Sequence, residues 1–325
     1  MLDQSPEIIP VEKTQYMPEI FDGGNHIIGE GSGVAVKSNG NILFVHRSKY
    51  NFNNEEIIDQ PVIFEYDGKS RKLISAWGEN YFKSPHGLAV DKYDNVWITD
   101  TQTNKVYKFD GNRNLVMTIG EDYRVGLELQ LRIRNKIRSF PVTSNKYILA
   151  KPTDVVIAEN GDVIISDGYR NSRVVRFNSS GKFIWEINHY GGGDYEFNLP
   201  HGIAVDDGGR IYVADRSNAR IQVFDGDGKY LKTWKGINIG RPFGNEVRGS
   251  RAYIADGGDF LYGKKDNNQS RIVVCDLEGQ VLEHFGVFGN AKGEMIVPHD
   301  IAVDSQGNIF VAEIGNKRLQ GFYRK

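Results

Sequence analysis

The sequence is poor in several features that would define its class at once. Its 325 residues include a single cysteine, Cys275, which excludes an intramolecular disulfide and favours a reducing compartment. No apolar run approaches 18 residues, so we expect no membrane-spanning helix. The opening residues, MLDQSPEIIP, have neither a basic nor an apolar region of the kind found in signal peptides. These absences together predict a cytoplasmic protein.

The chain also lacks an excess of charge of either sign. The chain has 40 Lys and Arg against 42 Asp and Glu, a formal net charge of −2. There is therefore no basic field for nucleic acid, and basic residues are not interleaved with aromatic ones. We expect a monomer without a nucleic acid or membrane partner.

What the sequence does contain is a repeat along its whole length. Five copies read GVAVKSNGNILFVHR from Gly33, GLAVDKYDNVWITDT from Gly87, DVVIAENGDVIISDG from Asp154, GIAVDDGGRIYVADR from Gly202 and DIAVDSQGNIFVAEI from Asp300. A degenerate sixth copy lies near 249–258. Each copy alternates strand-like runs rich in Val, Ile, Tyr and Phe with turns rich in Asn, Asp and Gly. Repeats of this length indicate an all-β, six-bladed β-propeller.

The repeat also predicts how the chain is organised. We expect residues 1–325 to form one propeller domain, in which the first 28 or so residues supply an outer strand to the last blade and close the ring. The segment 121–150 is an insertion between blades two and three, and it is the one place where a helix of some length fits. Its basic residues could line a substrate entrance or form a solvated surface; they are Arg124, Arg132, Arg134, Lys136 and Arg138.

A histidine follows proline at the same position in units two, four and six. These residues are His86 in SPHGLAVD, His201 in LPHGIAVD and His299 in VPHDIAVD. The first strand of a blade lines the central channel, and alternate blades of a six-bladed ring are about 120° apart. Three imidazoles would therefore converge, which is a donor set suited to a catalytic Zn²⁺. The alternative is that each histidine only caps a strand.

The loops after the second strands lie at the same end as these histidines. They contribute Arg47 and Arg216, from units one and four, and Tyr169 from unit three. Arginine suits the carboxylate of an anionic substrate, although a salt bridge within each blade is the alternative. A structural role as braces is predicted for the residues that recur: Arg173, Arg220, Arg271 and Arg318, with Asp100, Asp167, Asp215 and Asp256.

From about residue 29 onward the chain resembles NHL-repeat propellers, and more closely the lyase domain of peptidylglycine α-amidating monooxygenase. The stretches that carry the resemblance are SGVAV with FVHR, PHGLAVD, KPTDVVI, SDGYRNSRVVRF, PHGIAVD, VADRSNARIQVF and VPHDIAVD.

This resemblance implies a site. Zn²⁺ would be held by His86, His201 and His299, and Tyr169 would be the base, with Arg47 and Arg216 beside it. A structural Ca²⁺ would be bound by the backbone carbonyls of Val34 and Leu88 and the carboxylate of Asp300. The implied reaction cleaves a peptidyl or N-acyl α-hydroxyglycine to an amide and glyoxylate, so the expected partner is a small-molecule or peptide substrate with a carboxylate.

The chain departs from this family in ways that keep other functions open. Cysteines of the animal members are replaced by Arg170, Tyr212 and Val223, and the 325 residues include no hydroxylating domain. A non-catalytic NHL propeller that binds protein is one alternative. A Ca²⁺-dependent lactonase is another, and its site would use channel carboxylates and Asn rather than three histidines.

Overall fold

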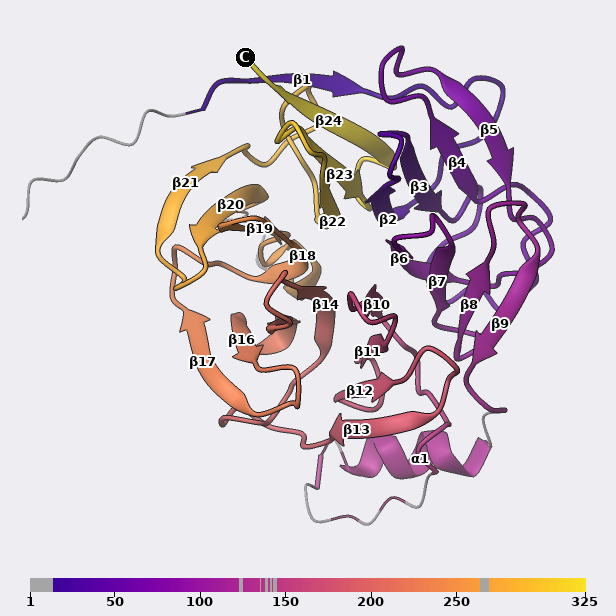
Figure 1. Ribbon diagram of the computed structural model, residues 1–325, viewed down its shortest axis with the longest axis vertical. Helices are drawn as coiled ribbons and strands as arrows, with labels where there is room; N and C mark the ends of the chain where they lie inside the picture. The colour runs from indigo at the N-terminus through magenta and orange to yellow at the C-terminus, as the bar shows by residue number, and fades with distance from the viewer. Residues whose placement is uncertain are drawn as a thin grey trace, which may run out of the picture.

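Six four-stranded antiparallel sheets surround a central axis in the computed structural model, as Figure 1 shows. The structure describes residues 14–122, 125–134, 136–137, 140, 142, 145–263 and 269–325. The all-β, six-bladed prediction is therefore confirmed.

The blades follow one another along the chain. Blade one comprises β2 (Gly31–Val36), β3 (Ile42–His46), β4 (Ile63–Tyr66) and β5 (Leu73–Trp77). Blade two comprises β6 (Pro85–Val90), β7 (Val96–Asp100), β8 (Lys105–Phe109) and β9 (Leu115–Ile119). Blade three comprises β10 (Asp154–Ile157), β11 (Val163–Asp167), β12 (Arg173–Phe177) and β13 (Phe183–Ile187). Blade four comprises β14 (Pro200–Val205), β15 (Ile211–Asp215), β16 (Arg220–Phe224) and β17 (Tyr230–Lys235). Blade five comprises β18 (Pro242–Arg248), β19 (Arg251–Asp256), β20 (Arg271–Asp276) and β21 (Val281–Phe285). Blade six comprises β22 (Pro298–Val303), β23 (Ile309–Glu313), β24 (Arg318–Arg324) and β1 (Tyr16–Ile20).

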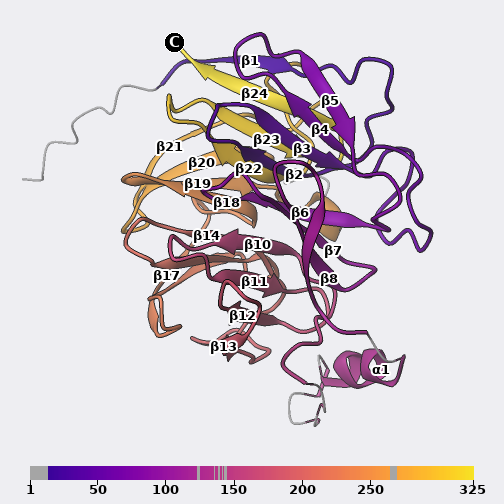
Figure 2. The same cartoon turned by 45° about the vertical axis from the view of Figure 1, so that its right-hand side comes forward.

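The last blade takes its outer strand from the other end of the chain. Strand β1 pairs antiparallel with β24, from Tyr16 opposite Arg324 to Ile20 opposite Gln320. Figures 1 and 2 both show β1 lying along β24 at the rim. This pairing closes the ring with backbone hydrogen bonds, so the first and last blades hold their places beside each other.

Tight turns and apolar faces explain why the repeats fold as blades. The turn between the first two strands has a left-handed glycine in five blades: Gly40, Gly161, Gly209, Gly249 and Gly307, with φ of 58–87°. Glycine adopts this conformation without steric strain. The cores lie between blades; one cluster joins Leu43 and Val45 of blade one to Ile98 and Phe109 of blade two. Burial of these faces positions each innermost strand against the channel.

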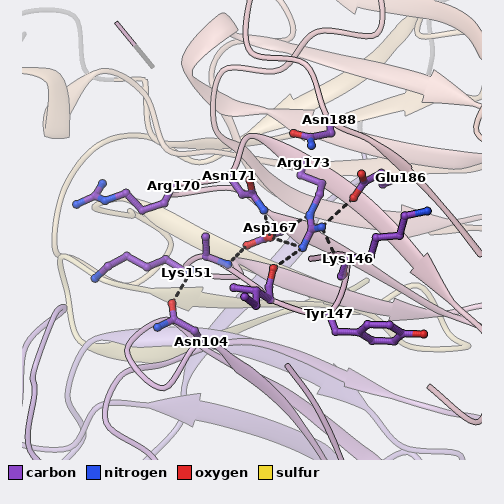
Figure 3. Close-up of polar contacts among 12 residues, drawn as sticks. Asn104, Lys146, Tyr147, Lys151, Asp167, Arg170, Asn171, Arg173, Glu186 and Asn188 are labelled. Atoms are coloured by element: carbon purple, nitrogen blue, oxygen red, sulfur yellow. Dashed lines mark hydrogen bonds and ion pairs between the residues drawn. The ribbon is translucent and has the colours of Figure 1, made fainter. Parts of the chain in front are cut away.

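Buried ion pairs brace four of the blades. An acidic residue that ends the second strand pairs with an arginine that begins the third: Asp167–Arg173 at 2.9 Å, Asp215–Arg220 at 2.8 Å, Asp256–Arg271 at 3.0 Å and Glu313–Arg318 at 2.7 Å. Figure 3 shows Asp167 between Asn171 and Arg173. The predicted structural role of these arginines is confirmed.

The insertion between blades two and three contains a helix, α1 (Val125–Arg134). It lies outside blade three in Figures 1 and 2, and its Leu127 and Leu131 pack against Ala150. No helix in the described part of the chain has the length and apolar content needed to cross a bilayer.

Helix α1 contacts the loop after β11, residues 168–172. Arg134 Nη2 donates to the carbonyl oxygens of Arg170 (3.2 Å) and Asn171 (2.5 Å). In turn, Arg170 Nε donates to Glu128 Oε1 at 2.6 Å. The insertion therefore fixes the loop from the outside of the ring. Of its other predicted basic residues, Arg124 and Arg138 lie outside the described residues.

Replacement of Arg134 by Met should loosen this loop because two backbone carbonyls lose their charged donor. We expect hydrogen exchange of the Tyr169 and Arg170 amides to accelerate about tenfold or more. These amides are bonded to the carbonyls of Lys151 and Ala150. Arg113→Met is the control, since the Arg113 side chain donates to the Ser75 hydroxyl and lies over the Trp77 ring, both in β5 of blade one. Equal exchange in both variants would contradict this role of α1.

Candidate active site

Three histidine side chains meet in the channel at the start of β6, β14 and β22. His86, His201 and His299 are only 1–2% exposed, and their ring centroids are 4.6–4.8 Å apart. One nitrogen from each lies within 4.8 Å of the other two. The ring geometry thus brings together residues that are about a hundred positions apart in the chain.

Each imidazole is oriented by the next blade. Nδ1–H of His86 donates to the carbonyl of Thr153 (2.6 Å), that of His201 to Phe243 (2.8 Å) and that of His299 to Ser32 (2.8 Å). Ser32 and Phe243 are the second residues of β2 and β18, and Thr153 directly precedes β10. Each holds the position that histidine holds in the alternate blades. A carbonyl can only accept, so Nδ1 carries the proton and the Nε2 lone pair is available in the channel.

The electrostatics of the centre keep the imidazoles neutral. Burial lowers the pKa of all three well below 6.5; Arg216 lowers that of His201 further, and Arg47 that of His299. Nε2 of His299 is buried and has no hydrogen-bond partner. Three neutral imidazoles with a converging, partly unsatisfied set of nitrogens fit a cation that prefers nitrogen ligands.

Tyr169 lies directly over this centre. Its hydroxyl is 3.0 Å from Nε2 of His86 and 3.3 Å from Nε2 of His201. Phe52 packs on its ring with centroids 5.0 Å apart, and Arg216 Nη1 approaches the hydroxyl at 3.5 Å. The loop that α1 contacts, residues 168–172, therefore places the Tyr169 hydroxyl at the mouth of the channel.

The two predicted arginines face the same centre in different ways. Arg47 is fully buried and its Nη1 donates to Glu30 Oε2 at 3.0 Å, so the alternative of a salt bridge holds for one of its nitrogens. Its Nε and Nη2 are buried without a partner. Arg216 begins a short 3₁₀ helix and lies over the rings of Phe243 (4.7 Å) and Tyr169 (5.4 Å). Unpaired buried guanidinium donors suit an anionic ligand.

A cavity of about 230 Å³ lies further along the channel. Val34, Leu88 and Asp300, the residues of the predicted Ca²⁺ site, all line it. Asp300 Oδ2 accepts the Val34 N–H at 2.8 Å, and burial raises the Asp300 pKa to about 7.

Four further polar residues line this cavity and were missed from the sequence: Asp154, Asn245, Glu246 and Arg248. Burial raises the pKa of Asp154 above its usual range and that of Glu246 to about 8, and Asn245 Oδ1 is buried without a partner. Asp154 had a sequence signal, because KPTD places it at the register of Asp300 in VPHD. Asn245, Glu246 and Arg248 lie just before the degenerate repeat and had none. The channel thus contains carboxylates and an Asn as well as three histidines.

Comparisons with known proteins agree with this architecture. The NHL repeat model matches residues 149–177, 197–224 and 296–322. A Caenorhabditis elegans protein described as a probable peptidyl-α-hydroxyglycine α-amidating lyase is 28% identical over 90% of this chain and 82% of its own length. Peptidyl-α-hydroxyglycine α-amidating lyase 1 of Drosophila melanogaster is 26% identical over 98% of this chain, which spans 61% of the Drosophila protein.

Comparison with solved structures supports the propeller fold. A streptogramin B lyase superposes with a TM-score of 0.59 over 95% of this chain and 98% of its own, at 13% identity. This likeness concerns the propeller alone. With the sequence relatives, it identifies the chain as a six-bladed NHL-repeat propeller that is similar, over most of its length, to the peptidyl-α-hydroxyglycine α-amidating lyases.

Proposed function

We propose that this protein is a Zn²⁺-dependent lyase that cleaves the C–N bond of an N-acyl or peptidyl α-hydroxyglycine. The products are an amide and glyoxylate. The observation that carries the proposal is the meeting of three imidazole nitrogens, the Tyr169 hydroxyl and two buried arginines in one channel mouth. The names of the relatives point to the same reaction class.

His86, His201 and His299 would hold the metal through Nε2, since each Nδ1 is committed to a backbone carbonyl. Three protein ligands leave one position open on a tetrahedral ion. Bound Zn²⁺ supplies Lewis acidity to an oxygen of the substrate.

Arg47 is the better candidate for the substrate carboxylate. Its Nε and Nη2 are buried donors that lack partners, and a carboxylate would satisfy both. Its Nη1 remains on Glu30, which fixes the orientation of the guanidinium. The cation is thus held in place before substrate arrives.

Tyr169 would move the proton. As its oxygen takes the proton of the substrate hydroxyl, the phenol passes its own proton to the amide nitrogen. The C–O bond becomes the C=O bond of glyoxylate, the C–N bond breaks, and the electron pair of that bond goes to the amide nitrogen. Arg216, 3.5 Å from the phenol oxygen, stabilises negative charge there during the transfer.

A structural Ca²⁺ fits the second cavity. Asp300 and the carbonyls of Val34 and Leu88 would supply oxygen ligands, which hard cations prefer. The carboxyl groups of the buried Asp154 and the partly buried Glu246 add negative charge to this cavity. Arg248 also lines it and lowers the Glu246 pKa against the larger effect of burial, but among the described residues no cationic side chain forms an ion pair with either carboxyl group. A bound cation would compensate for that burial.

The deciding experiment is a glyoxylate-release assay with N-acetyl-α-hydroxyglycine. We expect turnover by protein that contains about one zinc per chain, loss of turnover after chelation and recovery on adding Zn²⁺. His201→Ala should lose zinc and activity together, because two imidazoles rarely retain the ion. Zinc retained by this variant would contradict the ligand assignment; no metal at all would favour a non-catalytic module, and calcium alone a lactonase.

Replacement of Tyr169 by Phe should keep the zinc and remove the proton acceptor. We expect kcat to fall by about 10²-fold or more, the usual scale for a general base. Tyr195→Phe is the matched control, since its hydroxyl accepts the Tyr230 N–H in an exposed loop. Near-normal kcat in Tyr169→Phe would remove this residue from the chemistry.

Calcium should stabilise the propeller through the second cavity. At a hundred times its Kd the ion would add about 2.7 kcal/mol to the free energy of unfolding. The measurement is thermal unfolding with and without Ca²⁺ after chelation. Asp300→Asn should abolish the stabilisation, whereas Asp304→Asn, in an exposed turn, should retain it. An equal response of both variants would exclude Asp300 as a ligand.

A further inference from the structure

An open pocket of about 790 Å³ adjoins the loop that carries Tyr169. It is polar, and four cationic side chains line it: Lys83, Arg132, Lys151 and Arg170. It lies at the histidine end of the propeller, because it is built from the loops that follow second strands and from α1.

The pocket borders the proposed reaction centre through covalent neighbours. Arg170 follows Tyr169, and Asn53 follows Phe52, whose ring packs on Tyr169. The Tyr169 N–H also donates to the carbonyl of Lys151 at 3.3 Å. A substrate held at Tyr169 could therefore extend its acyl arm into this pocket.

Lys151 is fixed there by neutral groups. Its Nζ donates to Asn53 Oδ1 at 3.1 Å and to Gln102 Oε1 at 3.0 Å, which come from the loops of blades one and two. Among the described residues, no carboxylate lies within ion-pair distance of this nitrogen. Burial and the nearby Arg170 lower the Lys151 pKa, as expected for a cation that lacks a counter-ion.

The carboxylates of the pocket do not cancel its positive charge. Glu128 is shared by Arg132 (2.7 Å) and Arg170 (2.6 Å). Asp122 pairs with Lys105, which is not part of the lining. Glu55 alone is left to face Lys83 and Lys151, so an anion would complete the balance.

We propose that this pocket binds a carboxylate on the acyl arm of the substrate, with Lys151 as its principal partner. This inference rests on the proposed function and names the substrate class: an α-hydroxyglycine whose acyl group is itself acidic. The carboxylate of the hydroxyglycine unit is bound separately, at Arg47. Lys151 thus determines specificity and takes no part in the bond-breaking step.

The test measures binding without turnover. N-succinylglycine and N-butyrylglycine lack the reactive hydroxyl and have acyl chains of equal length, but only the first carries a second carboxylate. By calorimetry we expect N-succinylglycine to bind about tenfold more tightly, and this ratio should shrink at high salt. Lys151→Gln should bring the ratio close to one, and Lys151→Arg should retain most of it. Lys92→Gln, in a turn at the other end of the propeller, is the control and should leave the ratio unchanged.

Two results would overturn the proposed role of this pocket. One is that the unmodified protein binds N-succinylglycine and N-butyrylglycine equally well, and the other is that Lys151→Gln keeps the full difference in affinity. Failure of the reaction is a different result, because the protein would then bind N-succinylglycine selectively but release no glyoxylate from either N-acetyl- or N-succinyl-α-hydroxyglycine. That outcome would support binding of an acidic ligand in this pocket and would contradict the proposed lyase reaction.

Discussion

The hydrogen bond from each channel histidine to the next blade is the interaction on which the site depends. Nδ1 of His86, His201 and His299 donates to a carbonyl of the following innermost strand, so each ring is aimed by a neighbour rather than by its own blade. The pattern works only while the ring is closed, because the acceptor for His299 lies in blade one, at Ser32. Pairing of β1 with β24 is what keeps blades six and one in register. Closure of the fold and orientation of the imidazoles are therefore one constraint.

Charge is arranged along the channel in two zones. Arg47 and Arg216 lie at the mouth with the histidines and depress imidazole protonation, which keeps the lone pairs free. Deeper in the channel, Asp154 and Asp300 are buried and Glu246 is partly buried, and all three carboxyl groups have raised pKa values. Nitrogen donors thus face a mouth with two arginines, and oxygen donors occupy a separate acidic cavity. The two donor sets are suited to different cations.

Much of the fold was predictable because its signals are local and repeated. The alternation of strands and turns gave the six blades, and the recurrence of His after Pro marked one register three times. The acceptors of the histidine bonds were not predictable, since Ser32, Thr153 and Phe243 accept through backbone carbonyls, which every residue carries. The contacts of α1 with the loop that carries Tyr169 could not be predicted either, because Arg134 reaches Arg170 only when the insertion folds back. The partner of Arg47 was missed for a similar reason: Glu30 lies before the strand, outside the repeat.

The alternation of histidine and acceptor blades gives the centre a pseudo-threefold axis within a sixfold fold. Tyr169, Arg47 and Arg216 come from blades three, one and four, so they do not obey that axis. The three histidines and their three backbone acceptors look alike from three directions, so they cannot fix the orientation of a bound molecule. Only the loop residues can fix that orientation. Evolution can accordingly change which way a molecule lies over the three histidines by exchanging loop residues, while the inner scaffold that orients their rings stays the same.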